Sequence, residues 1–388
     1  MVFLGQVKSM KGKGGKTMFN GKKFVVILVL VFVAAIAAGC GGNNGASESR
    51  EDNSADASPG QVYKWDLGTC WPESITLQQM PVDFADRVNK LSNGQLKIKV
   101  HPAGAIVGAA EVLDATNAGT LDAYHDYPGY WIGKMPGAPF FASVPMIMEP
   151  FMYLNWMYEG GGLELMQKMY DEAGYNVKVL VLGVTHPEQL AVSHEPMQTM
   201  EDFKGLKYRT VGWWGEILRN IGVSVTSLPG AEVYPSLERG ILDAAEFSTP
   251  ANNKILGFEE VTEYISGPGM HQPGTLFTIG INKDKWNELP ANLQDLVETT
   301  AQAVTLDMWM KDLNQSMDAV GYFEEKGIKR VKTNEEVQKK LYQETVKLLD
   351  AKSKQEGGVF AEIWQSMKGY HDRFINYEEF MMPSRFTE

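Results

Sequence analysis

One phrase occurs twice in the chain, and it constrains the possible architecture more than any other feature. Residues 110–123 read AEVLDATNAGTLDA and residues 231–244 read AEVYPSLERGILDA, with seven of fourteen aligned positions identical. Composition alone matches about one position between two such windows. Each copy follows a β-rich segment that stops at Pro and Gly, and each has the pattern of a helix, a Gly turn and a short strand. The repetition therefore predicts two lobes of related architecture.

Strand and helix patterns alternate around both copies of the phrase. QVYKWDLGTC at 61–70 and QLKIKVHPAG at 95–104 have strand patterns and flank a helical pattern. FKGLKYRTVG at 203–212 and VSVTSLPG at 223–230 flank another. This alternation predicts an α/β protein with a mostly parallel sheet in each lobe. From Pro290 a helical pattern continues for more than thirty residues, and a helix of that length in a globular protein bridges lobes or meets a partner.

The N-terminal residues have the pattern of an export signal. The run KKFVVILVLVFVAAIAAGC has a basic pair, an apolar stretch and small residues before Cys40. We expect residues 1–40 to be a lipoprotein signal peptide with Cys40 lipidated, and residues 41–60, rich in Gly, Ser, Asn and Asp, to be a flexible tether. The folded part would then lie on the periplasmic or extracellular face of a membrane. A retained membrane anchor is the alternative, and translation starts at Met1 or at Met18.

Charge and motifs exclude several functional classes. A net charge of −12 argues against general nucleic-acid binding, which needs a basic face. Neither a GxxxxGK[ST] loop nor a GxGxxG fingerprint occurs, which excludes the common nucleotide-dependent classes. Cys70 is the only cysteine after Cys40, so no disulfide framework is possible in the folded part. An exported hydrolase or lyase, with Glu73, Asp126 and Glu246 as acid and base, remains an alternative that the spacing does not require.

The residues after each repeated strand are candidate ligand-binding positions, because α/β sheets bind ligands beyond the carboxyl ends of their strands. After the first copy, Tyr127 and Tyr130 are suited to wall a small-molecule pocket, unless they belong to the lobe core. After the second copy comes Glu246, which is a binding group or a solvated loop carboxylate and matches His125 in the repeat. Trp213 either walls the pocket or packs the lobe. The shared residues then build the lobes, and the unshared ones select the ligand.

Arg209 is the candidate group for recognising an anion. It lies in the strand pattern LKYRTVG, and its planar guanidinium offers two parallel N–H donors to a carboxylate. The alternative is an ion pair with Glu216 or Glu246. An arginine in the cleft of an acidic protein creates a local anion site without overall positive charge.

Three motifs in the second half of the chain carry a resemblance to a known family. They are FKGLKYR at 203–209, PSLERG at 235–240 and DAAE at 243–246. Together with GTCWPES and HPAGAIVGAAEVLDATNAGTLDA, they make the chain similar, over about 65–380, to the DctP-like solute-binding proteins of tripartite ATP-independent periplasmic (TRAP) transporters. The most similar branch is associated with 2-oxo acids, lactate and related carboxylates. The resemblance implies a two-lobed periplasmic-binding-protein fold that closes on a small organic carboxylate and delivers it to one small and one large membrane subunit.

The resemblance also implies roles for individual residues. Arg209 occupies the family's carboxylate-gripping position, and Gln189 matches a glutamine that contacts the ligand and a bound cation. Glu246 and the backbone of Phe247 match the cation-binding pair, although the branch usually has Trp where Phe247 stands. Gln272 stands where the relatives usually have Glu. Losing that carboxylate removes one charge from a site of oxygen ligands, so Na⁺ is easier to retain than Ca²⁺ as the cation that bridges the ligand.

The expected organisation combines the repeat, the long helix and the resemblance. Residues 61–182 form the first lobe, residues 183–274 the second, and residues 275–315 return to the first lobe and begin the long bridging helix. Residues 316–388 form C-terminal helices with contacts to the second lobe, between the lobes or in a dimer. Some relatives exchange the long helix in a homodimer, and residues 308–317 make that possible here. The main functional alternative is a binding protein that serves a sensor or an ATP-driven ABC importer.

Overall fold

The computed structural model describes residues 60–228 and 232–383. The chain divides into two compact units between Asn53 and Ser54, and all of the described residues belong to the second unit. Four predictions lie outside the described residues: the signal peptide, the lipidation site Cys40, the tether up to residue 59 and the Pro229–Gly230 turn. No helix in the described part of the chain is long and apolar enough to cross a membrane.

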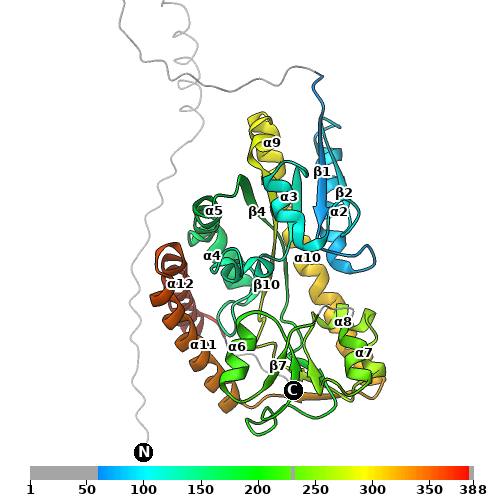
Figure 1. Cartoon of the computed structure of the whole chain (residues 1–388), viewed down its shortest axis with the longest axis vertical. Coiled ribbons are helices and arrows are strands. Elements are labelled where there is room, and N and C mark those ends of the chain that lie inside the picture. Colours follow the sequence, from blue (N-terminus) through cyan, green and yellow to red (C-terminus); the bar gives the residue numbers. More distant parts are fainter. Residues whose placement is uncertain (1–59, 229–231, 384–388) are drawn as a thin grey trace, which may run out of the picture. The chain divides into compact units, whose positions relative to one another are not determined.

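The first lobe is built on a mixed sheet (Figure 1). Within the described residues its strands are, in sheet order, β2 (Leu96–His101), β1 (Tyr63–Thr69), β3 (Ala123–Asp126), β10 (Thr275–Asn282) and β4 (Val177–Thr185). β1 pairs in parallel with β2 and β3, whereas β10 is antiparallel to β3 and β4. Of these strands only β10 runs against the others, so the sheet is mostly parallel. β4 continues past residue 182, the boundary that the sequence predicts for this lobe.

The second lobe is built on a sheet of the same kind. Its described strands are, in sheet order, β11 (Lys329–Lys332), β9 (Tyr264–Gly267), β5 (Ala191–Ser193), β8 (Ala244–Ala245), β6 (Lys207–Arg209) and β7 (Ser224–Thr226). β6 pairs in parallel with β7 and β8, and β11 pairs in parallel with β9. β5 is antiparallel to β8 and β9, and it is the one described strand of this sheet that runs against the others.

The repeated phrase occupies the same place in both sheets. Its strand is β3 in the first lobe and β8 in the second, and each lies between one parallel and one antiparallel neighbour. Its helix is α3 (Val112–Asn117) in the first lobe and α7 (Val233–Glu238) in the second. The predicted α/β fold with two lobes of related architecture is confirmed by this shared order.

Identical residues of the repeated phrase have the same structural role in both copies. Gly119 and Gly240 have φ of +76° and +65°, a conformation that favours glycine. Asp122 and Asp243 each accept a 2.8 Å hydrogen bond from a backbone N–H of the neighbouring parallel strand. The valine, the leucine and the final alanine of each copy are at most 2% exposed. The shared residues therefore fix the turn, the strand's attachment to the sheet and its core contacts.

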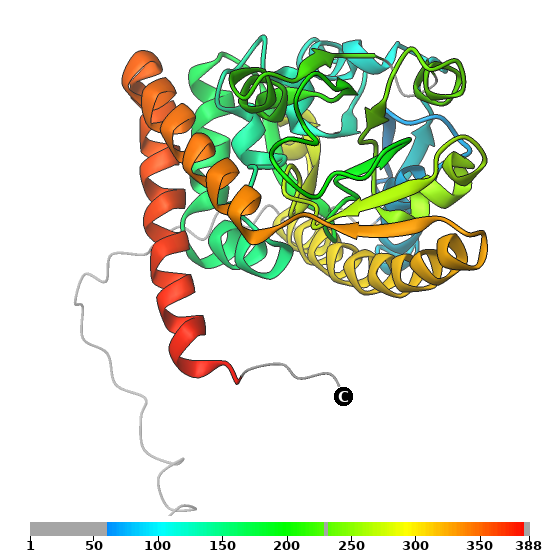
Figure 2. The ribbon, with the colours of Figure 1, turned by 90° about the horizontal axis from the view of Figure 1, so that it is seen from below.

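Two short crossings and one long helix connect the lobes. Residues 186–190 lead from β4 to β5, and residues 268–274 lead from β9 to β10. The crossings touch, because the Glu188 backbone N–H donates to the Gln272 carbonyl at 3.1 Å. α10 (Ala291–Glu325) packs against β4 of the first lobe and against α8 and β11 of the second (Figure 2). The predicted long bridging helix is therefore confirmed, and it extends past residue 315.

Asp312, inside α10, ties the long helix to the first crossing and to the start of α8. Its carboxylate accepts hydrogen bonds from the His186 backbone N–H at 2.9 Å and from the Thr249 hydroxyl at 3.0 Å. The crossings themselves approach so closely that a Cβ on Gly269 would lie 2.1 Å from the Glu188 carbonyl oxygen. Only glycine fits there without moving the backbone. This region therefore holds the side chains around it in defined positions between the lobes.

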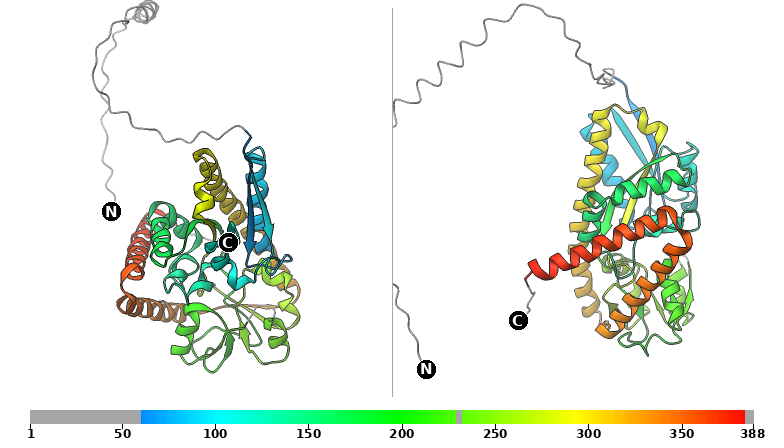
Figure 3. Two further views of the ribbon diagram at one scale, coloured as in Figure 1. Left: turned by 45° about the horizontal axis from the view of Figure 1, so that its top comes forward. Right: turned by 90° about the vertical axis from the view of Figure 1, so that its left-hand side faces the viewer.

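The remaining helices cover the sheets and end the chain. They are α2 (Gln79–Leu91), α4 (Pro150–Glu159), α5 (Gly162–Glu172), α6 (Gly212–Asn220), α8 (Pro250–Ile255), α9 (Lys283–Asn287), α11 (Glu335–Glu356) and α12 (Gly358–Met381). α11 packs against α6 of the second lobe, and α12 packs against α4 and α5 of the first (Figure 3). The C-terminal helices therefore contact both lobes.

Candidate functional site

A cavity of about 380 Å³ lies between the lobes. Its walls come from the ends of β1, β3 and β10 on one side, and from the ends of β6 and β8 and the crossings on the other. Six residues predicted from the sequence line it: Arg209, Glu246, Phe247, Gln272, Tyr127 and Tyr130. Gln189 and Trp213 do not line it, and neither do Glu73 and Asp126. The acid–base trio of the hydrolase or lyase alternative is therefore not brought together.

Aromatic side chains form the first-lobe wall of the cavity. Trp71 lies with its ring centroid 5.7 Å from that of Phe277, and Tyr127 lies 5.2 Å from Tyr130. Trp71 and Tyr130 are 6.3 Å apart, which joins the two pairs into one surface. Tyr130 is 52% exposed, so it stands at the rim rather than in the lobe core. This wall suits an apolar or aromatic ligand body.

His125 supports this wall from behind instead of facing the ligand. It is fully buried, its Nδ1 accepts a 2.8 Å hydrogen bond from the Trp71 indole N–H, and its Nε2 is 2.9 Å from the Leu182 carbonyl. Burial lowers the pKa of His125 to about 4, so the imidazole is neutral and donates from Nε2. The repeat predicts His125 as a ligand-selecting position, whereas the structure gives it a supporting role through Trp71.

Asp126, the next residue, is a buried carboxyl whose titration affects stability. Its oxygens accept hydrogen bonds from the Thr278 hydroxyl at 2.5 Å and from the Trp131 indole N–H. Burial nevertheless raises the pKa of Asp126 to about 7. A raised folded-state pKa contributes stability that is present below the unfolded value and lost as pH rises through the folded value.

We therefore expect the free energy of unfolding to fall between pH 5 and pH 7.5, and Asp126→Asn to remove that part of the fall. In Asp126→Asn, Oδ1 can accept from the Trp131 indole N–H, and Nδ2 can donate to the Thr278 hydroxyl once that hydroxyl rotates from donor to acceptor. The difference between the two proteins is on the order of 2–4 kcal/mol, since one pKa unit is 1.36 kcal/mol. Urea unfolding at both pH values measures it. Parallel pH profiles for the two proteins would contradict the assignment.

Arg209 and Glu246 form a buried ion pair on the second-lobe wall. Arg209 Nη1 donates to Glu246 Oε1 at 3.2 Å and to the Glu246 carbonyl at 2.8 Å. The Val211 N–H also donates to Glu246 Oε1 at 3.2 Å, which leaves Oε2 for other partners. Glu216 pairs with Lys352 instead, at 3.0 Å. The ion-pair alternative predicted for Arg209 is thus present with Glu246, in a side chain that also lines the cavity.

The guanidinium of Arg209 is fixed but retains capacity for a ligand. Its Nε and Nη2 both donate to the Leu228 carbonyl at 3.1 Å. Nη2 carries two hydrogens, and among the described residues only one of them has an acceptor. Phe247 lies below the guanidinium, with the ring centroid 5.9 Å from Cζ. These contacts hold the positive charge at the cavity wall with one N–H available.

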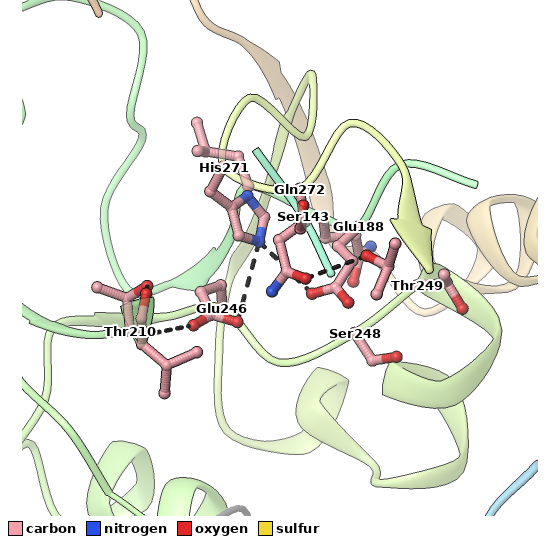
Figure 4. A network of polar contacts seen from close by, with 12 residues as sticks. Ser143, Glu188, Thr210, Glu246, Ser248, Thr249, His271 and Gln272 are labelled. Atoms are coloured by element: carbon pink, nitrogen blue, oxygen red, sulfur yellow. Dashed lines mark hydrogen bonds and ion pairs between the residues drawn. The ribbon is translucent and has the colours of Figure 1, made fainter. Parts of the chain in front are cut away.

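Three buried side chains that can bind a metal ion meet beside this pair (Figure 4). His271 Nε2 lies 3.5 Å from Glu188 Oε2 and 3.9 Å from Glu246 Oε2. All three residues are at most 7% exposed, and burial raises the pKa of Glu188 above the ordinary glutamate range. Neither Glu188 nor His271 is predicted from the sequence, because only the contact between the two crossings brings positions 188 and 271 together.

The predicted cation ligands are not gathered in the same way. Gln189 Oε1 accepts a 2.7 Å hydrogen bond from Asn253 Nδ2. Gln189 lines a neighbouring cavity, whereas Glu188 lines both that cavity and the one between the lobes. Gln272 Oε1 accepts from the Thr275 hydroxyl at 3.0 Å. Of the predicted set, only Glu246 belongs to the three-residue cluster. The residues present fit a cation, but through different ligands.

Trp213 packs between elements and lines a small cavity of about 40 Å³ that shares Tyr127, Tyr130 and Gln272 with the main one. It is 2% exposed, and its ring centroid lies 4.8 Å from Phe140 and 6.1 Å from Phe360 of α12. Trp213 is therefore a packing residue that also borders the adjoining small cavity, and its role toward a ligand stays a prediction. Because α6 carries Trp213 and the second lobe's Trp214, the contact joins α6 to the aromatic core of the first lobe and α12.

The two α/β lobes share a topology and are connected by short crossings. They enclose a cavity lined by polar and aromatic side chains. This arrangement defines a two-lobed periplasmic-binding protein. The family model of DctP, bacterial extracellular solute-binding protein family 7, matches residues 67–355. The chain therefore belongs to this family of solute-binding receptors.

Curated relatives and solved structures that resemble this chain agree with this assignment. A monocarboxylate 2-oxoacid-binding periplasmic protein of Nostoc sp. is 29% identical over 83% of this chain and 90% of its own length. A TRAP solute-binding protein of Colwellia psychrerythraea, with bound calcium and pyruvate, is 27% identical with a TM-score of 0.78 over 83% of this chain and 98% of that one. One of Pseudoalteromonas atlantica, with sodium and pyruvate, is 27% identical with a TM-score of 0.76, over 83% and 97%.

Proposed function

We propose that this protein is the extracytoplasmic solute receptor of a TRAP transporter and binds a small organic carboxylate of the 2-oxo or 2-hydroxy acid type. The observation that carries the proposal is Arg209, a buried cation on the wall of the cavity between the lobes, whose Nη2 keeps one N–H without an acceptor among residues 60–228 and 232–383. The 2-oxoacid-binding relative and the pyruvate-bound neighbours support the ligand class. A small and a large membrane subunit would receive the ligand.

The two walls of the cavity would contact the two ends of such a ligand. Its carboxylate accepts from Arg209, while Gln272 orients a second oxygen. Its body lies against Trp71, Tyr127 and Tyr130, which exclude water. Because the walls belong to different lobes, ligand contacts made to both are present only in the closed state and stabilise it.

A bound cation fits the charged wall. When bound, it would supply positive charge to carboxylate oxygens of both ligand and protein. Neighbouring structures hold sodium or calcium together with pyruvate, and a further one, from Bordetella bronchiseptica, holds calcium and picolinate at 25% identity and a TM-score of 0.77. In this chain Glu246, with Glu188 beside it, would hold the cation.

The receptor role is favoured over the alternatives by the composition of the cavity. Of the candidate acid and base residues only Glu246 lines it, which supports binding without turnover. A sensor or ABC importer partner would use the same cavity, so a pair of TRAP membrane subunits encoded beside this chain is what favours the TRAP assignment. The signal pattern before Cys40 supports export and a lipid anchor on the periplasmic or extracellular face. One neighbour was crystallised as a dimer, which supports the possibility of a homodimer here.

A melting-temperature screen tests this function. A ligand that binds the folded state stabilises it by mass action, by about 2.7 kcal/mol at 100 times its Kd. We expect pyruvate, lactate or a larger 2-oxo or 2-hydroxy acid to raise the melting temperature by several degrees with divalent cations present, and sugars of similar size to leave it unchanged. Consumption of the carboxylate without added cofactor would revive the hydrolase or lyase alternative.

A further inference from the structure

The cluster of Glu188, Glu246 and His271 has the composition of a transition-metal site. His271 is 2% exposed, and within the described residues neither ring nitrogen has a hydrogen-bond partner. Glu188 Oε2 and Glu246 Oε2 likewise lack one. A buried polar atom without a partner costs about 1–3 kcal/mol. His271 Nε2 and the two carboxylate oxygens meet only at the long ion-pair distances of 3.5 and 3.9 Å, and His271 Nδ1 has no partner among the described residues. One ion among them would satisfy three of these atoms together.

The distances between the donor atoms fit a small divalent ion. His271 Nε2 lies 3.5 and 3.9 Å from the two carboxylate oxygens, and the three donor atoms lie within 4.8 Å of one another. Ligands at 2.0–2.2 Å from a tetrahedral Zn²⁺ are roughly 3.3–3.6 Å apart. The two His271 distances differ from that spacing by a few tenths of an ångström, whereas a separation of 4.8 Å needs roughly 1 Å of movement in the long glutamate side chains.

The imidazole distinguishes this cluster from a sodium or calcium site. Ca²⁺ prefers oxygen ligands throughout, whereas imidazole suits Zn²⁺, Cu²⁺, Fe²⁺ and Ni²⁺. The Arg209 and Val211 donors hold Glu246 by Oε1, so Oε2 points toward His271 (Figure 4). The hydrogen bonds to Oε1 fix the orientation of the carboxylate, and hydrogen bonds of this kind orient metal ligands in known sites.

The charges in the cluster favour a divalent ion over a monovalent one. Two carboxylates and the Arg209 guanidinium leave one net negative charge in a buried site. A divalent cation and one carboxylate ligand bring that charge to zero, whereas Na⁺ and the same ligand leave it negative. Uncompensated buried charge is costly, so neutrality of the loaded site is the stable arrangement.

We propose that Glu188, Glu246 and His271 bind a divalent transition metal of the Zn²⁺ class, with the fourth position open toward the cavity. Three protein ligands and one exchangeable position are the pattern of zinc sites that accept an external oxygen ligand. The open position would take the carboxylate of the bound solute; this step and the charge balance of the loaded site rest on the proposed function, whereas the choice of a transition metal rests on the His271 imidazole. This receptor would then differ from the sodium- and calcium-bound neighbours in the class of its metal.

Metal titration of the chelator-treated protein, without any carboxylate, tests the proposal. We expect one Zn²⁺ per chain by calorimetry, and Co²⁺ to give intense visible absorption from a low-coordinate site with a nitrogen ligand. A ~1000-fold excess of Ca²⁺ or Na⁺ should not displace Zn²⁺, because neither ion prefers imidazole. Displacement by Ca²⁺, or no Zn²⁺ binding, overturns the proposal.

Variants locate the metal within the chain. His271→Asn and Glu188→Gln should each weaken Zn²⁺ binding by ~100-fold or more, since even outer-shell changes cost 10- to 100-fold. His194→Asn is the matched control, because His194 Nδ1 lies 3.1 Å from Glu263 Oε2 in a pair outside the cavity. Equal Zn²⁺ affinity in His271→Asn and the unmodified protein overturns the assignment. The Co²⁺ spectrum of the unmodified protein keeps the test independent of variant folding.

Separate measurements of carboxylate affinity distinguish the two proposals. If Zn²⁺ binds as expected but no carboxylate binds in its presence, the metal site stands and the receptor function fails. If a carboxylate binds equally well to metal-free protein and Zn²⁺ does not bind, the metal site fails and the receptor function stands.

Discussion

Replacing Arg209 with alanine is expected to lower carboxylate affinity by at least ~30-fold, since removing one partner of a buried charge pair costs roughly 2–5 kcal/mol. Among the described residues that line the cavity, Arg209 is the only one with a permanent positive charge. It is 7% exposed and held by the Leu228 and Glu246 carbonyls, so its position does not have to be created on binding. Calorimetric titration with the best ligand of the melting-temperature screen measures the change.

Two further variants separate recognition from stability. Arg209→Ala also leaves Glu246 without its ion-pair partner, and we expect a lower melting temperature for that reason. Arg209→Lys keeps a positive charge but lacks the planar pair of donors, so it should recover only part of the affinity. Arg219→Ala, at an exposed position of α6, is the matched control and should bind normally. Unchanged affinity in folded Arg209→Ala protein would remove Arg209 from the site.

Removing bound cations is expected to lower carboxylate affinity by roughly 10- to 100-fold, because a hydrogen bond or contact to a charged group contributes about 1.5–3 kcal/mol. Without a cation, the carboxylates of Glu188 and Glu246 face an incoming anionic ligand across a buried wall. Repulsion between them then opposes the attraction of Arg209. Calorimetry on chelator-treated protein in cation-free buffer, before and after a divalent cation is restored, measures the difference.

The chelator experiment can be repeated on the Glu246→Gln variant for comparison with the unmodified protein. Glu246→Gln removes one of the two carboxylates, so its carboxylate affinity should respond less to the chelator than that of the unmodified protein. Full carboxylate affinity of the unmodified protein in cation-free buffer would show that carboxylate binding needs no cation. That result would hold whether or not Glu188, Glu246 and His271 bind a metal ion.

Local sequence patterns were sufficient to predict the architecture. Gly119 and Gly240 mark turns that require positive φ, and Asp122 and Asp243 mark strands that bond to a parallel neighbour. These are short-range requirements, so the same residues recur wherever the same unit is built. The long helix from residue 291 was equally visible, because one helical pattern continues through it without a break.

The side chains of the site were predictable only where they follow a strand. Arg209, Glu246 and Tyr127 end or follow strands and line the cavity as the α/β rule predicts. Glu188 and His271 lie in irregular crossings, where no periodicity says which of two neighbouring side chains faces the cavity. Gln189 was therefore predicted in the place that the structure gives to Glu188, a difference of one residue.

Recognition of a carboxylate group by the cavity is tested most directly by titrating the protein with an acid and with its uncharged amide. Calorimetry compares the best-binding 2-oxo or 2-hydroxy acid with its carboxamide, which has the same shape and no charge. We expect the acid to bind and the amide to bind at least ~30-fold more weakly, because the amide lacks the charge that Arg209 recognises. Equal affinity of acid and amide, or no affinity for any acid with cations present, would contradict it.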